Sequence, residues 1–326
     1  MHRFARPLAG ALLCVACGVC AWAQSAPQYP SRPIRLVVPT SPGGGVDTMA
    51  RLLAQQLTEA WGHQVVVDNR GGAGGNVGTE LVAKSPPDGY TIELGTNGTH
   101  TVNHSLYSNP PFNGVRDFAA VTMTATTPNV LVVHPSVQAH SVKELIALAK
   151  AHPGQINYAS PGPGTPPHLA AEIFRSMAGI NIVHVPYKGA GPASVDLLGG
   201  HVQMMIANAP VVLPHIKAGK LRALGTTSVK RPAILPDIPT IAEAGLSGYE
   251  ADTWYGIFAP AGTPRDIVQK LNADIAQVLF SKDLKELYAA QGAEVVGNGV
   301  DEFAAQVRAD SAKWAKVIKE IGVKVD

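Results

Sequence analysis

Loops rich in glycine and hydroxyl groups carry the chemistry that this sequence suggests. The first, PTSPGGGVD at residues 39–47, stands between an apolar run at 34–38 and a helix-period stretch that starts near Met49. A strand, a glycine turn and a helix start in this order point free backbone N–H groups at whatever lies before the turn, and proteins bind small anions in this way without a cation. The pattern predicts a binding site for a small acid.

Three more such loops lie between a predicted strand and a predicted helix, at residues 69–78 (NRGGAGGNVG), 96–99 and 160–168 (SPGPGTPPH). Glycine lets the main chain approach a ligand oxygen because it has no Cβ, and hydroxyl and amide groups donate hydrogen bonds to a carboxylate. The residues expected at the ligand are Thr40, Ser41, Gly43, Gly44, Asp47, Gly75, Asn76, Thr96, Ser160, Gly164, Thr165, His168, Tyr187, Ala207 and Asn208.

Several of these residues have a structural alternative. Asp47 is expected at the N-cap of the helix after the first loop, and Asn76 is expected to cap the next helix, so each either holds its loop or also meets the ligand. Thr165 fits an N-cap before two prolines. His168 lies in the first turn of that helix, where the dipole disfavours imidazolium, so it serves as a neutral donor to the ligand or to the loop. Tyr255, which is not among these candidates, stands at the expected return crossover between two lobes and is expected to pack there as part of a hinge.

Enzyme activity is not expected. Ser160 with His168 suggests a periplasmic hydrolase as an alternative, but the elbow G-x-S-x-G needs glycine where Tyr158 stands, and no acidic partner is evident. The second loop approaches a dinucleotide fingerprint, but Val77 occupies the place of its third glycine. His100 and His104 are four residues apart without a third ligand. We therefore predict no catalytic residue, no cofactor and no metal site.

The N-terminus has the pattern of a signal peptide. Two arginines precede an apolar stretch at 8–19 that is too short to span a bilayer, and Ala-Trp-Ala at 21–23 is a small-x-small cleavage site. We expect cleavage near Ala23 and export to the periplasm. All three cysteines lie in this segment, so the mature chain is expected to have no thiol. Lipidation at Cys17 or Cys20 stays an alternative.

The charge balance excludes two classes of partner. Removing the leader takes away two arginines and no acid, so 26 minus 2 leaves 24 basic residues against 24 acidic ones. A surface without net charge argues against nucleic acid and against adhesion to an anionic membrane. We expect a monomer that binds neither.

Short β-rich runs alternate with amphipathic helical patterns over the whole mature chain, which is the signature of α/β architecture with mostly parallel sheets flanked by helices. About 300 residues exceed one compact core, so we expect two lobes. The strands are predicted at residues 34–38, 65–67, 90–94, 130–133, 157–159, 182–185, 203–206, 223–226, 254–258 and 294–296. Ligands collect at the carboxyl ends of strands in such sheets, where the glycine loops fall.

Nine ordered segments resemble one family. They are PTSPGGGVD, NRGGAGGNVG, SPPDGYT, PNVLVVHPS, INYASPGPGTPPHLA, HVPYKGAGPA, PHIKAGKLRALGTTS, LPDIPTIAEAGL and WYGIFAPAGTP. Their order is that of the Bug (Bordetella uptake gene) family, also called TctC, the substrate-binding proteins of tripartite tricarboxylate transporters. The resemblance implies a type II periplasmic-binding fold, with lobe 1 at 28–126 plus 253–326 and lobe 2 at 127–252.

The resemblance also implies a function. Such a protein closes on a small carboxylate by rotation about crossovers near residues 123–129 and 248–253, and presents the closed form to permease subunits. A ligand sensor for a signalling receptor is the alternative, because it uses the same closure. Many relatives have an aromatic residue where this chain has Thr40. The loss of a ring exchanges apolar contact for a hydroxyl group, which favours a dicarboxylate or an aromatic acid as the ligand.

Overall fold

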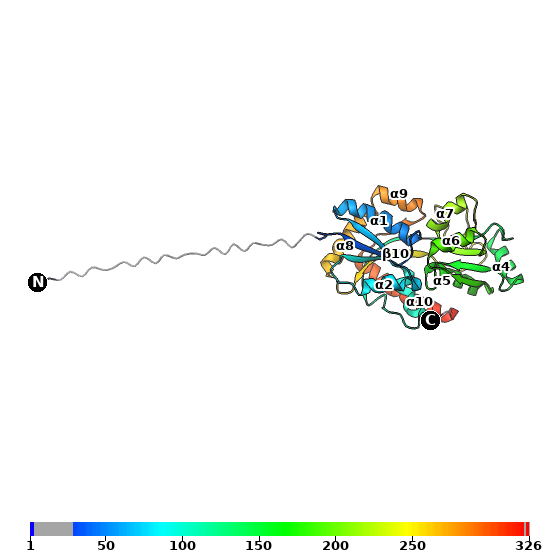
Figure 1. The fold of residues 1–326 in the computed structure, drawn as a ribbon, viewed down its shortest axis with the longest axis horizontal. Coiled ribbons are helices and arrows are strands. Elements are labelled where there is room, and N and C mark those ends of the chain that lie inside the picture. Colours follow the sequence, from blue (N-terminus) through cyan, green and yellow to red (C-terminus); the bar gives the residue numbers. More distant parts are fainter. Residues whose placement is uncertain (3–28, 323, 326) are drawn as a thin grey trace.

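The structure is a computed structural model of the 326-residue chain that describes residues 1–2, 29–322 and 324–325. The expected signal peptide, its cleavage near Ala23 and the lipidation alternative at Cys17 or Cys20 fall on residues 3–28, outside the described part. The described chain folds into two lobes that lie side by side, each built on one sheet (Figure 1).

Lobe 1 contains a six-stranded sheet with the order β11-β4-β10-β3-β1-β2. Its strands are β1 (Ile34–Val38), β2 (Val65–Asn69), β3 (Thr91–Thr96), β4 (Phe118–Thr127), β10 (Thr253–Pro260) and β11 (Glu294–Val295). Its helical elements are α1 (Gly45–Trp61), η1 (Ala73–Gly75), α2 (Asn76–Ala83), the π-helix η2 (Gly98–Val102), α3 (Asn103–Leu106), α8 (Arg265–Leu279), α9 (Lys282–Ala290) and α10 (Val300–Ile321).

Lobe 2 contains a five-stranded sheet with the order β7-β6-β8-β5-β9. Its strands are β5 (Asn129–Val133), β6 (Asn157–Ser160), β7 (Val183–Pro186), β8 (Met204–Asn208) and β9 (Arg222–Thr226). Its helices are α4 (Val142–Ala151), α5 (Pro166–Ala178), α6 (Ala190–Leu198) and α7 (Ala209–Lys217).

The apolar periodicity of the sequence fixes which face of each helix is buried. In α1, Met49, Leu53 and Leu57 recur at intervals of four and are fully buried against the lobe 1 sheet. The helix ends where Gly62 adopts a left-handed conformation with φ 65°, which glycine adopts without a Cβ penalty. Burial of a side chain of this size contributes about 1.5–3 kcal/mol, so this stripe anchors the helix and the loop before it.

All ten predicted strands are present, but the sheets are mixed rather than mostly parallel. In lobe 1 the pairs of β1 with β2 and with β3 are parallel, whereas β10 runs antiparallel to β3 and β4, and β11 runs antiparallel to β4. In lobe 2, β5 runs antiparallel to β8 and β9. The reason is that β4 carries the chain out of lobe 1 and β10 carries it back, so the two run in opposite directions.

The sequence prediction missed β4, a strand of ten residues that reads FAAVTMTATT. Small and hydroxyl side chains give this segment no clear alternation, and its pairing with the apolar β10 decides its conformation. Only Pro128 separates β4 from β5, and the return passage enters β10 at Thr253. Both passages fall within the expected crossovers, while the exact limits of the lobes remain a prediction.

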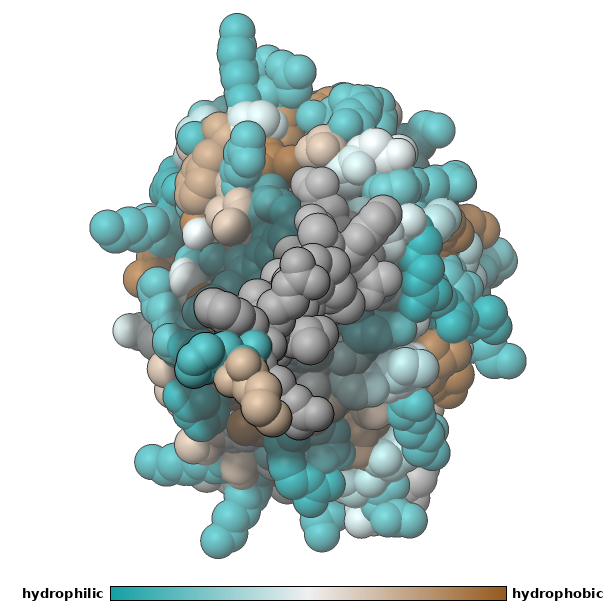
Figure 2. Space-filling view, turned by 90° about the vertical axis from the view of Figure 1, so that its left-hand side faces the viewer, coloured by the Kyte–Doolittle hydropathy of each residue, from teal (hydrophilic) through white to brown (hydrophobic). Residues whose placement is uncertain are grey.

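The described surface and helices were compared with what a membrane span or a metal site requires. Figure 2 shows one end of lobe 1, where hydrophilic side chains cover most of the visible surface and apolar residues are scattered in small groups. Among the described residues, no helix is long and apolar enough to cross a bilayer. The described part also contains no group of three or more His, Cys, Asp or Glu side chains placed to hold a metal ion.

Candidate ligand site between the lobes

The glycine loops of both lobes meet around a small enclosed cavity of about 30 Å³, here called the inner cavity. Its lining residues are Pro39, Thr40, Gly44, Gly45, Val46, Gly74, Thr96, Thr99, Pro161, Thr165, Pro166, Pro167, Ala190, Asn208 and Thr253. They include the first residues of α1 from lobe 1 and of α5 and α6 from lobe 2, together with Asn208, the N-cap of α7. Several helix N-termini therefore converge on one point from both sides.

This convergence favours an anion although none of the residues that line the inner cavity is charged. Each helix N-terminus carries unpaired N–H groups and about half a positive charge. The contributions of α5 and α7 differ. Pro166 and Pro167 have no N–H and present ring surfaces instead. At the start of α7, the Ala209 N–H already donates to the Pro128 carbonyl at 3.0 Å and Pro210 has no N–H. Dipoles and hydroxyl groups thus replace the cation that a carboxylate would otherwise need.

A second space of about 250 Å³, the outer cavity, adjoins the first and shares Thr40, Gly74 and Thr165 with it. Its other walls are the second glycine loop, residues 161–163 and the segment that leads into α6, including Tyr187 and Lys188. Lys188 is exposed and brings a cation to the mouth of the site. The two spaces together offer an uncharged inner end and an outer end with one positive charge.

The lobes touch each other around these cavities, so the structure is closed. Tyr107 of lobe 1 donates a hydrogen bond to the Pro163 carbonyl of lobe 2 at 3.0 Å, and the Ser41 hydroxyl donates to the Lys188 carbonyl. At the passage between the lobes, the Asn97 amide donates to the Asp252 carbonyl at 3.1 Å. The closed form is therefore stabilised by side-chain donors of lobe 1 that bond to main-chain carbonyls of lobe 2, in addition to any contacts that a bound ligand makes.

The first loop is held by Asp47, which does not occupy the predicted N-cap position. Gly44 is the N-cap of α1, and Asp47 lies inside the first turn with its carboxylate accepting from the Gly43 N–H at 2.9 Å and from Arg51 at 3.0 Å. Asn69 donates to the other oxygen at 3.0 Å. Burial opposes ionisation of Asp47, but these hydrogen bonds and the Arg51 charge outweigh it and lower the pKa of the carboxyl group. Asp47 shapes the loop and has no oxygen left for a ligand.

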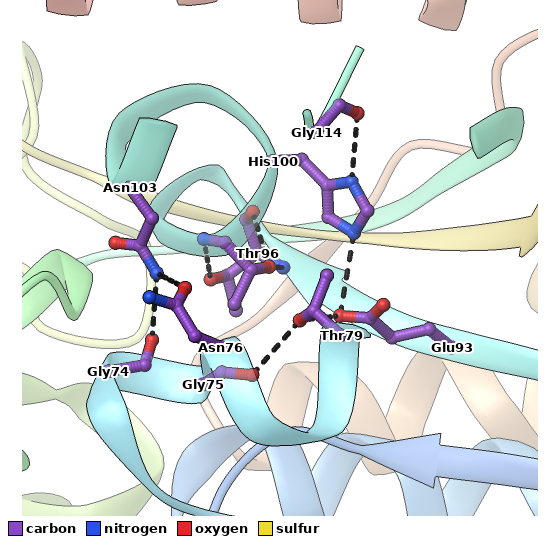
Figure 3. A network of polar contacts seen from close by, with 10 residues as sticks. Gly74, Gly75, Asn76, Thr79, Glu93, Thr96, His100, Asn103 and Gly114 are labelled. Atoms are coloured by element: carbon purple, nitrogen blue, oxygen red, sulfur yellow. Dashed lines mark hydrogen bonds and ion pairs between the residues drawn. The ribbon is translucent and has the colours of Figure 1, made fainter. Parts of the chain in front are cut away.

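A buried network holds the second loop (Figure 3). The Asn103 amide donates to the Gly74 carbonyl at 3.1 Å and to the Asn76 side-chain oxygen at 2.7 Å. Gly75, not Asn76, is the N-cap of α2, so the predicted cap is wrong and Asn76 instead joins the loop to α3. Behind the loop, the Thr79 hydroxyl lies 3.1 Å from the Gly75 carbonyl and 2.8 Å from a carboxylate oxygen of Glu93, which is fully buried.

Two neutral histidines lie under the fourth loop. His168 accepts a hydrogen bond at Nδ1 from the Gly164 N–H at 3.3 Å, and its ring lies 4.4 Å from that of His184. The partner of Ser160 is His184, at 2.6 Å, and not His168. The hydrolase alternative fails here, because Ser160 is fully buried and its hydroxyl accepts from the Gly162 N–H. Both His168 and Ser160 support the loop from behind and line neither cavity.

His168 gives a pH-dependent prediction. Burial, with His184 beside it, lowers the pKa of His168 to about 4, whereas a histidine in an unfolded chain titrates near 6.5. The unfolded chain then binds the extra proton, so the stability from this neutral histidine is complete above pH 6.5 and is lost as the pH falls toward 4. We expect this group to lower the free energy of unfolding by about 2 kcal/mol between pH 7 and pH 4.5.

The prediction is measured by comparing the wild type with a His168 variant, because Asp252 changes the free energy of unfolding with pH in the opposite direction. Burial raises the pKa of Asp252 to about 6, so its unfavourable contribution grows as the pH rises from 4 to 6. Denaturant unfolding of the wild type and of His168→Gln at pH 7 and pH 4.5 isolates the histidine, since Asp252 is common to both. Equal pH dependence in the two proteins would contradict the prediction.

The structure brings some of the predicted contacts together and leaves others apart. Thr40, Gly44, Thr96, Thr165 and Asn208 line the inner cavity, and Ser41, Gly75 and Tyr187 line the outer one. The Thr165 hydroxyl already donates to the Gly162 carbonyl at 2.7 Å. Residues that line neither cavity are Gly43, Asp47, Asn76, Ser160, Gly164, His168 and Ala207. That these cavities hold the ligand remains a prediction for all of them.

Gly45 belongs to the glycine run of the first loop that was expected to face the ligand. The other lining residues of the inner cavity were not expected there: Pro39, Val46, Gly74, Thr99, Pro161, Pro166, Pro167, Ala190 and Thr253. Gly74 and Thr99 belong to two of the predicted glycine loops, at 69–78 and 96–99. Their position in these loops, next to residues that were expected at the ligand, could have identified them. Ala190 and Thr253 carry no such signal, because small residues at the start of a helix or strand become lining residues only when the opposite lobe arrives.

A groove of about 820 Å³, larger than either cavity, lies on lobe 1 between the segment before β1, α1 and α8. It shares no lining residue with the two cavities, and it carries side chains of both charges, such as Lys270 and Asp274. These two already pair at 2.9 Å. The groove lacks the converging N–H groups of the inner cavity, so size alone does not make it the candidate site.

Comparison with known proteins identifies the family. The model of the TctC family, described as tripartite tricarboxylate transporter family receptor, matches residues 49–323. The protein belongs to the TctC family. It is 42% identical over 302 residues to protein BugT of Bordetella pertussis, which covers 92% of this chain and 93% of that protein. The resemblance found in the nine sequence segments is confirmed.

Solved structures of TctC type share the fold. R. palustris Rpa4515 with adipate has a TM-score of 0.88 and 40% identity, covering 91% of this chain and 99% of that one. MatC (Rpa3494) from Rhodopseudomonas palustris with bound malate has a TM-score of 0.85 and 30% identity, covering 89% and 100%. The expected two-lobe periplasmic-binding fold is confirmed. TctC proteins are periplasmic receptors for small carboxylates, so this chain is a binding protein rather than an enzyme.

Proposed function

We propose that this TctC protein is exported, loses its leader near Ala23, and binds a dicarboxylate between its lobes as a monomer. One carboxylate occupies the inner cavity, among the helix N-termini. Its volume of about 30 Å³ corresponds to roughly two waters, which the two oxygens of a carboxylate replace. The carbon chain then leads into the outer cavity, where Lys188 meets the second carboxylate.

The observation that carries this proposal is the convergence of helix N-termini from both lobes on an uncharged cavity. Similar proteins solved with adipate and with malate, both dicarboxylic acids, support the choice of ligand class. The Thr40 side chain borders both cavities. It leaves room there that an aromatic residue would fill.

Delivery to permease subunits of a tripartite tricarboxylate transporter completes the proposal. A ligand favours the closed form only through contacts that the open form lacks. The cross-lobe contacts of Tyr107 and Ser41 exist only when the lobes meet, so the closed form has a surface that a membrane partner can distinguish from the open form.

A thermal-shift screen of the refolded, ligand-free protein tests the ligand class. The probes are succinate, malate and adipate, with butyrate and benzoate as monoacids. We expect a dicarboxylate at a hundred times its dissociation constant to stabilise the fold by about 2.7 kcal/mol. Butyrate at the same concentration should stabilise the fold less. A shift with benzoate alone would replace the dicarboxylate by an aromatic acid. The absence of any shift with all five acids would overturn the carboxylate proposal.

A further inference from the structure

One buried hydroxyl group of lobe 1 has no hydrogen-bond partner. The side chain of Tyr255 on β10 is fully buried, and its oxygen makes no hydrogen bond within the described residues. The other fully buried tyrosines all have one: Tyr158 with Glu172, Tyr249 with the Ala170 carbonyl at 2.7 Å, and Tyr288 with the Met49 carbonyl at 3.1 Å. A buried hydroxyl without a hydrogen-bond partner costs about 1–3 kcal/mol of stability. Such groups are rare in folded proteins, so we expect Tyr255 to gain a partner when a ligand binds.

The Tyr255 hydroxyl does not itself line the inner cavity but lies directly behind two residues that do. A Cβ placed on Gly45 would come within 2.9 Å of this oxygen and within 3.1 Å of the Asn208 Cβ, so the hydroxyl fits into space that only glycine leaves open. Gly45 and Asn208 both line the inner cavity. Thr96, which also lines it, is the cross-strand partner of Tyr255.

A second unpartnered hydroxyl supports the same reading. The buried oxygen of Thr40 has no hydrogen-bond partner either, and Thr40 lines the inner cavity from the first loop. Burial raises the pKa of Tyr255, so this phenol keeps its proton and is a donor over the whole physiological range. Two unused hydroxyl groups thus lie at the start of α1: that of Thr40, which lines the cavity, 3.9 Å from a Cβ on Gly44, and that of Tyr255 2.9 Å from a Cβ on Gly45.

We propose that the Tyr255 hydroxyl donates a hydrogen bond to the carboxylate held in the inner cavity and is a specificity-determining residue of the site. This inference rests on the proposed function. The Asn208 amide group has no free N–H for the ligand, since it donates to Asn129 at 2.8 Å and to Thr253 at 3.0 Å. Tyr255 can therefore donate a side-chain hydrogen bond to the carboxylate, whereas the neighbouring Asn208 amide cannot.

The test is calorimetric titration of the full mature protein with succinate, malate and adipate. A hydrogen bond to a charged group corresponds to about a 10- to 100-fold change in the dissociation constant, so Tyr255→Phe should weaken the best of the three acids by this factor. Its melting temperature without ligand should stay level or rise, because the lost hydroxyl had no partner. Tyr288→Phe is the matched control: its melting temperature should fall while its dissociation constant stays within twofold.

A second variant tests the same proposal independently, in case Tyr255→Phe does not fold. Gly45→Ala places a methyl group against the tyrosine oxygen, so it should weaken the same acid by a similar factor with Tyr255 unchanged. Unaltered affinity in a folded Tyr255→Phe or in Gly45→Ala would overturn the inference and leave the proposed function intact. Failure of all three acids to bind the wild type would overturn the proposed function and the inference with it.

Discussion

Replacing Gly74 with alanine is expected to weaken acid binding by about 100-fold, because the added methyl group prevents closure. A Cβ at this position would lie 2.1 Å from the Pro163 carbonyl oxygen of the opposite lobe. The obstacle is main chain on both sides, so no side chain can rotate away from it. Only separation of the lobes relieves the overlap, and a protein that rarely reaches the closed state binds with an apparent affinity reduced by that fraction.

Gly62→Ala is the control for backbone strain. Gly74 has φ 64° and Gly62 has φ 65°, so alanine suffers the same left-handed conformation at both positions, at a cost of about 1–2 kcal/mol. No atom lies within 4 Å of a Cβ on Gly62, which stands at the end of α1. Titration calorimetry with adipate, malate or succinate should show normal affinity for Gly62→Ala and lost affinity for Gly74→Ala. Equal affinities would refute the claim that closure at Gly74 limits binding.

Replacing Glu93 with alanine is expected to lower the free energy of unfolding by about 3 kcal/mol. Glu93 and His100 are both fully buried, with Nε2 of the histidine 3.4 Å from the carboxylate, and the imidazole stacks on Phe258 at 3.5 Å between ring centroids. Figure 3 shows how this pair joins the second loop through Thr79. Without the carboxylate, the Thr79 hydroxyl keeps only the Gly75 carbonyl, and Nε2 of His100 loses its 3.4 Å contact with Glu93 in a dry interior.

Glu93→Gln separates the hydrogen bond from the charge. The amide oxygen can still accept from Thr79, so we expect a loss of about 1 kcal/mol and a second loop that keeps its position. Guanidinium-induced unfolding measures both variants, and proteolysis of the folded proteins reports whether the segment at 69–78 becomes accessible. If Glu93→Ala unfolds at the wild-type denaturant concentration, the network of Figure 3 does not support the fold as argued.

Sequence reasoning was most successful where one local signal decides the outcome. The apolar run at 34–38 and the recurrence of Met49, Leu53 and Leu57 produce a strand and a helix wherever they are placed, and glycines between them require a turn. It failed at β4, whose alanines and threonines gain their conformation from β10. It also misplaced Asp47, because the chain is still extended at Gly44, with φ −86° and ψ 169°, and turns helical at Gly45, two residues before the first acidic residue.

Apart from β4, the sequence by itself determined the order of the strands, the four glycine loops and the family, since each depends on residues close together in the chain. Only the tertiary structure decided which residues line the site. Thr253 and Tyr255 lie more than 150 residues from the three glycine loops of lobe 1, and they come there because β10 returns from lobe 2 and pairs with β3. The physical reason is that periodicity and turn chemistry are local, whereas a cavity is defined by groups from both lobes that touch only after closure.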